Sequence, residues 1–146
     1  MAVTSKFYGQ FFTSLANKEL DFDSDQIKAM LVSSSYTFDQ DAHRYKSSIT
    51  GEITGTGYTA GGLVLPTPSL AYDGPTNRLI FDGADLSWTG ATWTNARGAV
   101  LYDNTPATDA ARPLICYVDF GADQPVTSST FQLVWDPAGI AYVTVA

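Results

Sequence analysis

A glycine-rich stretch, GTGYTAGG, contains the residue types that a phosphate-binding loop needs. Gly55, Gly57 and Ala60 match the spacing of the dinucleotide-binding fingerprint, in which a helix follows the glycines and its N-terminal amides meet the pyrophosphate. Here the chain continues GGLVLPTPSL, which is rich in β-forming residues and contains Pro66 and Pro68. No lysine follows the glycines, as a P-loop would require. The sequence therefore favours a glycine-rich bend where backbones approach closely over a nucleotide site.

An acidic run has part of the spacing of a calcium-binding loop. Asp21, Asp23 and Asp25 occupy the first three ligand positions of an EF-hand. The sixth position is Gln26 where the motif needs glycine, and the twelfth is Val32 where it needs glutamate. The loop therefore cannot close around calcium in that way. A looser cation site and a solvated turn before a strand are the two remaining interpretations.

Other reactive residue types are sparse. Asp39 and Asp41 lie near His43, the single histidine, which suggests either a metal site or proton relay, or simply a polar loop. Cys116 is the only cysteine, and its apolar surroundings in LICYVDF predict a buried thiol and exclude an intrachain disulfide. Signature motifs of serine hydrolases, zinc proteases, dithiol redox proteins and kinases are absent. We expect no catalytic, cofactor-binding or metal site, and hence no enzyme.

Two tryptophans have a spacing that a carbohydrate-binding surface could use. Trp88 and Trp93, in SWTGATWTN, could form an aromatic platform for the apolar faces of sugar rings. Packing in the core or at a subunit interface is the commoner use of tryptophan in a β-protein, and we favour it.

One helix is expected near the N-terminus. Apolar residues fall at helical spacing within residues 4–17, despite Gly9. These residues are Phe7, Tyr8, Phe11, Phe12 and Leu15. We therefore predict a short amphipathic helix and describe residues 1–20 as a helical N-terminal element.

The rest of the chain alternates with the period of β-strands. Ile27, Ala29 and Leu31 predict a half-buried strand that directs Lys28 to the other side. SLAYDGPTNRLIFDG predicts a hairpin around its DGPTN turn. Further strands are predicted in GAVLYD, PLICYVDFG, FQLVWD and IAYVTVA, the last two joined by the tight turn DPAG. Seven to eight short strands with the N-terminal helix predict an all-β fold, an antiparallel β-sandwich or barrel.

Length and composition limit the classes of partner. The 146 residues, without linker or repeat, suggest one domain over residues 1–146. A net charge of -7 and a pI near 4.3 disfavour binding to nucleic acid or to anionic lipid. No apolar run resembles a secretion signal or a membrane span. Charged residues make up only 16% of the chain and aromatic residues 13%, so we expect a partner to cover part of the surface.

Several segments together resemble a family of small virion proteins of tailed bacteriophages. The segments are SSSYTFDQDAHRY, EITGTGYTAGG, FDGADLSWTGATW, GAVLYD and PLICYVDFG, in this order. The resemblance covers most of the chain and implies a structural role in the virion. A capsid decoration or cement protein on the head is the expected form, with the major capsid protein as its partner. None of the shared segments is catalytic.

The expected role leads to a set of candidate interface residues. A lattice protein must match local symmetry, so we predict a homo-oligomer, with a trimer as the expected state. The candidate interface residues are aromatic: Phe7, Tyr8, Phe11, Phe12, Trp88 and Trp93. Residues 4–20 would serve as a docking element, either on their own sandwich or on a neighbouring subunit. The alternative function is a tail or head-fibre adhesion module that binds carbohydrate through Trp88 and Trp93.

Overall fold

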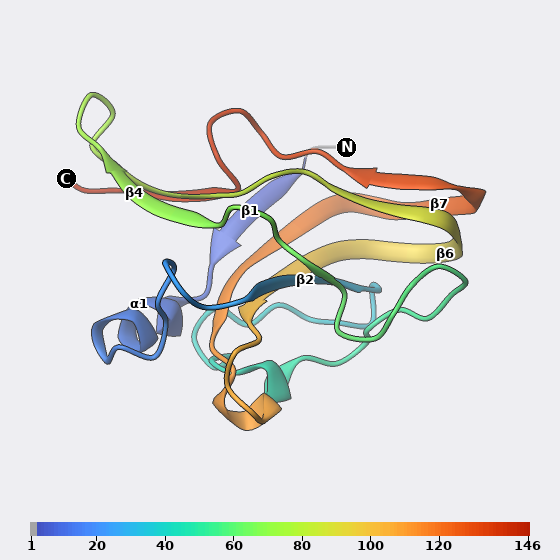
Figure 1. Cartoon of the computed structure of the whole chain (residues 1–146), viewed down its shortest axis with the longest axis horizontal. Helices are drawn as coiled ribbons and strands as arrows, with labels where there is room; N and C mark the ends of the chain where they lie inside the picture. Colours follow the sequence, from blue (N-terminus) through green and yellow to red (C-terminus); the bar gives the residue numbers. More distant parts are fainter. Residues whose placement is uncertain (1–2) are drawn as a thin grey trace.

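The computed structural model describes residues 3–146 as two antiparallel sheets with one short helix beside them (Figure 1). The five-stranded sheet has the order β1-β7-β6-β2-β3, and the three-stranded sheet has the order β4-β5-β8. The strands are β1 (Thr4–Phe7), β2 (Ile27–Val32), β3 (Leu63–Val64), β4 (Ser69–Asp73), β5 (Arg78–Asp82), β6 (Leu86–Asp103), β7 (Leu114–Leu133) and β8 (Ala141–Thr144). The helices are α1 (Gly9–Ala16) and the 3-10 turns η1 (Lys46–Ser48) and η2 (Asp109–Ala111). The all-β, sandwich-like prediction is confirmed, and the sheets do not close into a barrel.

The N-terminal segment differs from the prediction. Residues 4–7 form strand β1, which pairs with β7, and the helix begins only at Gly9. The predicted helix over residues 4–17 was therefore wrong in its first turn. The helical spacing of Phe7 and Phe11 does not distinguish a continuous helix from a strand followed by a helix. In the structure their rings stack at 5.1 Å across the strand–helix junction. Pairing with a strand more than a hundred residues away overrides the local pattern.

Strands β6 and β7 form one long ribbon that gives the molecule its two layers. They pair from Leu86 with Leu133 at one end to Tyr102 with Leu114 at the other. The register shifts several times between Trp88 and Gly98, and such bulges bend a ribbon. Figure 1 shows the ribbon curving back on itself at the right of the view.

The bulges explain what the strand prediction missed. The alternation of apolar residues predicted separate strands at residues 98–103, 113–121 and 131–136, and it predicted no strand at residues 86–97. In the structure the first belongs to β6 and the other two to β7, which ends at Leu133, before Trp135. Each register shift breaks the alternation, so a single strand looks like several in sequence.

The glycine-rich stretch is a bend, as predicted. Gly57, Gly61 and Gly62 have positive φ angles of 79°, 91° and 79°. A Cβ atom at Gly62 would overlap the carbonyl oxygen of Ala29 in β2. The Glu52 carboxylate fastens the bend by accepting hydrogen bonds from the Tyr58 hydroxyl at 2.7 Å and from the Gly61 amide at 2.6 Å.

The bend also changes the surroundings of β2. The sequence predicted a half-buried strand, but Met30 and Val32 are as fully buried as Ala29 and Leu31. Strand β2 lies inside the sheet, between β6 and β3, and the Tyr58 hydroxyl accepts a hydrogen bond from the Leu31 amide at 3.0 Å. Both faces of β2 are therefore covered from Ala29 to Val32.

The predicted hairpin is confirmed. Strands β4 and β5 pair Leu70 with Phe81 and Tyr72 with Leu79 around the DGPTN turn. The DPAG turn is also present, closed by a 2.9 Å hydrogen bond from the Gly139 amide to the Asp136 carbonyl. This turn connects β7 to β8, but β8 pairs with β5 and completes the three-stranded sheet.

Candidate interaction surface

The two tryptophans that were considered as a sugar platform lie in the core. Trp88 is 2% exposed and Trp93 is 4% exposed. Their rings meet edge to face at 6.3 Å, and both pack against Phe131. Neither ring face is open to a sugar, which agrees with the favoured interpretation of core packing.

The other candidate interface residues are used mainly inside the chain. Phe7, Tyr8 and Phe11 are buried, and Phe12 is partly buried against the same cluster. Of the two placements considered for residues 4–20, the structure shows packing on the chain's own sandwich. Buried side chains of this kind can meet a partner only after rearrangement, so the surface available for binding lies elsewhere.

The acidic run over residues 21–25 forms a turn. The Asp25 carboxylate accepts a hydrogen bond from the Asp21 amide at 2.7 Å, and the Asp21 carboxylate accepts one from the Asp23 amide at 3.0 Å. The second bond is an Asx turn, and the first closes the run on itself, so both carboxylates satisfy nearby backbone amides. Throughout residues 3–146, no three acidic, histidine or cysteine side chains are grouped to hold a metal ion.

His43 belongs to a chain of hydrogen bonds. Its Nδ1 atom lies 2.9 Å from the Tyr36 hydroxyl, which lies 2.8 Å from the Tyr8 hydroxyl. Asp39 instead caps its own loop, where it accepts hydrogen bonds from the amides of Asp41 and Ala42, and these bonds lower the pKa of its carboxyl group. The cluster therefore ties the loop to the start of α1, and the Asp39 carboxylate hydrogen-bonds to backbone amides of its own loop.

Cys116 is fully buried, as the sequence predicted. Burial raises the pKa of its thiol well above the usual range. A protonated thiol without access to solvent is a poor nucleophile.

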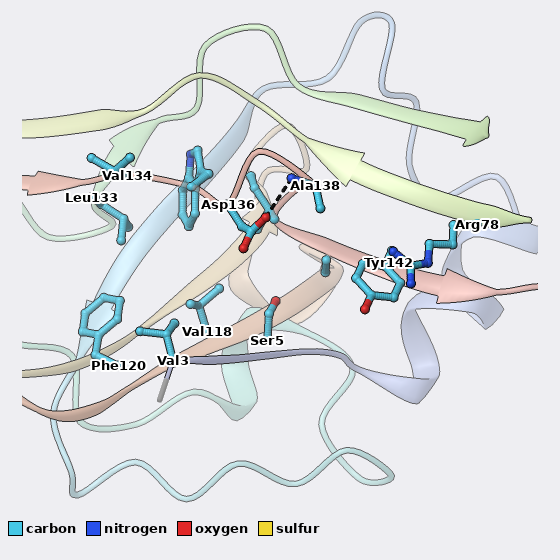
Figure 2. Close-up of a pocket in the computed structure, with 14 residues that line it drawn as sticks. Val3, Ser5, Arg78, Val118, Phe120, Leu133, Val134, Asp136, Ala138 and Tyr142 are labelled. Carbon is cyan, nitrogen blue, oxygen red and sulfur yellow. Dashed lines mark hydrogen bonds between the residues drawn. The ribbon is translucent and has the colours of Figure 1, made fainter. Parts of the chain in front are cut away.

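A cleft of about 670 Å³ lies between the edges of the two layers. We call it the edge cleft. Its apolar lining consists of Val3, Val118, Phe120, Leu133, Trp135 and Ile140, and its polar lining includes Ser5, Arg78 and Asp136. Figure 2 shows Val3, Val118 and Phe120 on one side and Leu133 and Val134 on the other, with Arg78 and Tyr142 toward the opposite end from Phe120.

Exposed apolar side chains gather at this cleft. Val3 is 63% exposed, Val134 is 62% exposed and Tyr142 is 46% exposed. Trp135 forms a fixed wall, because its indole Nε1 donates to the Ala84 carbonyl at 2.9 Å and its amide donates to the Asp85 carboxylate at 2.9 Å. A largely preformed apolar recess of this size is typical of binding sites.

The cleft is bordered by two unpaired strand edges. Within the described residues, β1 pairs only with β7, and β8 pairs only with β5. The Tyr8 amide donates to the Ile115 carbonyl at 3.1 Å, whereas the Phe7 carbonyl faces away from β7 and accepts from the Gln40 side chain at 3.2 Å. Because alternate residues of an antiparallel strand face the same neighbour, Ser5 directs its amide and carbonyl outward, as Phe7 does.

A positive charge lies toward one end of the cleft. The Arg78 guanidinium carbon lies 3.9 Å from the centre of the Tyr142 ring, the geometry of a cation–π contact. Arg78 forms no ion pair with the residues that the structure describes. Its guanidinium group is therefore held in place without an acidic partner.

Sequence reasoning did not find the edge cleft. Its residues come from β1, β5, β7, β8 and the turn before β8, and none belongs to a recognisable motif. One available signal was Val134, an apolar residue out of phase with the alternating Phe131, Leu133 and Trp135, which the alternation predicts to be exposed.

Comparisons with protein-family models, with curated proteins and with solved structures found no match to this chain. Among the described residues, no helix has the length and apolar character needed to cross a membrane.

Proposed function

We propose that this protein is a non-enzymatic structural protein that binds a protein assembly, and that the assembly is the head of a tailed bacteriophage. The observation that carries the binding role is the edge cleft, where Val3, Val134 and Tyr142 are exposed beside two unpaired strand edges. Exposed apolar side chains next to free backbone groups are typical of protein-binding surfaces. The virion assignment rests on the resemblance of the sequence segments described above.

The arrangement of reactive groups is consistent with a binding role. The Cys116 thiol is buried, the Asp21 and Asp39 carboxylates cap turns, and His43 bonds to Tyr36. Each of these groups has a structural partner or is closed to solvent. Binding energy from such a chain comes from buried apolar area, at about 25 cal/mol for each Å².

A decoration protein would stabilise the particle by mass action. A ligand that binds the assembled shell and not its separated subunits adds about 2.7 kcal/mol for each site at a hundredfold excess over Kd. This contribution repeats at every site of the shell. Weak individual contacts would therefore produce a large collective effect.

Heating of particles tests this function. Particles assembled with and without the protein are heated, and the temperature at which DNA becomes accessible to a dye is recorded. We expect a higher release temperature for particles that carry the protein. Equal release temperatures at full occupancy would contradict the cement role.

The oligomeric state is a separate part of the proposal. We propose a homo-oligomer, with a trimer as the expected state, because a closed cyclic assembly matches the local symmetry of a shell. Light scattering of the purified protein at high micromolar concentration measures it. A strictly monomeric mass, together with monomeric density on the particle, would contradict it.

The carbohydrate-binding alternative loses its main support, because both indole rings of its predicted platform are buried. A glycan array with the purified protein tests it directly. Saturable binding to a sugar would favour an adhesion module over a cement protein.

A further inference from the structure

We propose that the edge cleft binds an extended segment of a partner protein, which adds a strand to the free edge of β1 and places a carboxylate against Arg78. This inference rests on the proposed function in that it takes another protein as the partner. It adds the conformation and the chemistry of the part that docks.

The extended conformation follows from the backbone groups at the cleft. Ser5 directs an amide and a carbonyl away from β7, and no described strand pairs with that edge. A strand laid along β1 satisfies both groups with its own backbone. A helix offers no free backbone groups along its length, so an apolar helix would leave this edge unpaired.

The apolar side chains follow from the walls of the cleft. Ser5 and Phe7 alternate along β1 and face the same layer, since Ser5 lies opposite Val118 and Phe7 lies opposite Cys116 in the register. Val3, just before β1, lines the cleft as well. A new strand beside β1 would point every second side chain toward Val118, Phe120 and Leu133. The partner segment therefore needs apolar residues at alternate positions.

The carboxylate follows from Arg78. Its guanidinium group stacks on Tyr142 and lacks an acidic partner in the described part of the chain. A guanidinium group held over a ring can still present two of its N–H donors side by side to a carboxylate. An Asp, a Glu or the C-terminus of the partner segment at this end supplies that group. The chain as a whole is acidic, with a net charge of -7, and Asp136 also lines the cleft, so Arg78 marks the end of the cleft where an acidic group of a partner would bind.

Strand addition also explains why the cleft is placed at the open side of the sandwich. The five-stranded sheet ends at β1 and the three-stranded sheet ends at β8, and both ends border the cleft. One added strand would cover apolar side chains from both layers. The recess is therefore the position of a missing strand.

The probe for this proposal is a random library of peptides of about ten residues, selected for binding to the purified full-length chain. We expect the selected peptides to share alternating apolar residues and one acidic residue or a free C-terminus. Hydrogen exchange should show protection of the Ser5 amide when peptide is bound. Selected peptides that bind without protecting Ser5, or a library that yields no binder, would overturn the proposal.

Variants locate the site. Val134→Asp should weaken binding of the selected peptides at least about tenfold, whereas Val64→Asp, at a similarly exposed valine on β3 outside the cleft, should leave it unchanged. Both valines are exposed, so both variants should fold, and circular dichroism checks this. Equal binding by the two variants would overturn the assignment to the cleft.

The carboxylate contact has its own test. Arg78→Ala should weaken the binding of a selected acidic peptide about tenfold. It should have little effect on the binding of the same peptide when its acidic residue is replaced by the corresponding amide. Equal losses for the two peptides would overturn the pairing with Arg78. If light scattering without peptide shows a dimer that Val134→Asp dissociates, the occupant is a second copy of the chain and the partner assignment is wrong.

These results are distinguishable from those on the particle. Peptide binding at the cleft with no change in DNA release temperature would support the docking mode and contradict the cement role. If the protein raises the release temperature and Val134→Asp raises it equally, the result would support the cement role and contradict docking through the cleft.

Discussion

Gly62 lies where the fold leaves no space for a side chain. Its φ angle of 79° is left-handed, and a Cβ atom there would meet the backbone of Ala29 and Met30 in β2. The bend can therefore lie directly on the strand, backbone against backbone. This close approach is the physical use of the glycine-rich stretch that resembled a phosphate loop.

We predict that Gly62→Ala lowers the free energy of unfolding by at least about 3 kcal/mol, because positive φ and the overlap with Ala29 both oppose the methyl group. Urea unfolding followed by tryptophan fluorescence measures the change. Gly74→Ala is the control, since a Cβ atom added at Gly74 would have no other atom within 4 Å, and it should change stability by no more than about 0.5 kcal/mol. A loss of similar size in both variants would contradict the argument.

Asp103 is a buried carboxylate with an incomplete set of partners. Its Oδ1 atom accepts a hydrogen bond from the Thr105 amide at 2.8 Å, and its Oδ2 atom has no partner among the described groups. Burial raises its pKa to about 6, and the neighbouring Asp25 carboxyl group adds to the rise. The folded chain thus holds a proton at Asp103 more tightly than the unfolded chain does.

The sign of the pH dependence follows from that shift. Above pH 6, Asp103 is ionised in both states and its burial lowers stability; as the pH falls from about 7 toward 4, protonation removes this penalty. We predict that Asp103→Asn is more stable than the wild type at pH 7 and that the difference shrinks on acidification. Thermal unfolding from pH 7 to pH 4 measures it, with the exposed Asp23→Asn as control. A constant difference between Asp103→Asn and wild type would contradict the prediction.

The junction of β1 and α1 is tied to the loop before η1 by two tyrosines. The Tyr8 ring is fully buried, and its hydroxyl has the Tyr36 hydroxyl at 2.8 Å as its partner. Burial raises the pKa of Tyr36 to about 12, so both hydroxyls stay protonated near neutral pH. A neutral, paired hydroxyl is compatible with a buried aromatic cluster, whereas an unpaired one is costly.

We predict that Tyr36→Phe lowers the free energy of unfolding by about 1–3 kcal/mol, because it leaves the Tyr8 hydroxyl buried without that partner. The double variant Tyr8→Phe with Tyr36→Phe removes both hydroxyls and should recover part of the loss. Urea unfolding of the single and double variants measures the coupling. If the loss of unfolding free energy in the double variant equals the sum of the losses in the two single variants, the predicted coupling between the hydroxyls would be contradicted.

At the scale of the whole molecule, distant segments hold the layers together. Strand β1 pairs with β7, and β2 pairs with β6, so the five-stranded sheet forms only when the N-terminal part of the chain meets segments about 70 to 110 residues further along the chain. Such non-local pairing loses loop entropy before its contacts form.

We predict a single cooperative unfolding transition for residues 1–146 and refolding in milliseconds to seconds, the range of proteins dominated by non-local strand pairs. Calorimetry tests the first part, and stopped-flow fluorescence of Trp88, Trp93 and Trp135 tests the second. Two separate transitions would contradict the interpretation as one domain. Refolding in microseconds would contradict the dominance of distant pairs.

The sequence by itself determined the features that depend on near neighbours. The hairpin of β4 and β5 has its turn and both alternating strands within fifteen letters, and Pro66 and Pro68 exclude a helix after the glycine-rich bend. The burial of Cys116 followed from the apolar residues on either side of it. In each case the deciding contacts or steric limits lie within one element or one turn.

Only the tertiary structure decided which edges stay free and which aromatic side chains are covered. Residues 4–7 join β7 instead of continuing a helix, because a sheet edge distant in sequence is available to them. Trp88 and Trp93 are covered because Tyr58 of the glycine-rich bend and Phe131 of β7 pack against both rings. Arg78 meets Tyr142 only because β8 pairs with β5. The position and lining of the edge cleft depend on the order of the strands and on the curvature of the ribbon. Both arise from contacts between distant segments, so the spacing of neighbouring residues does not reveal them.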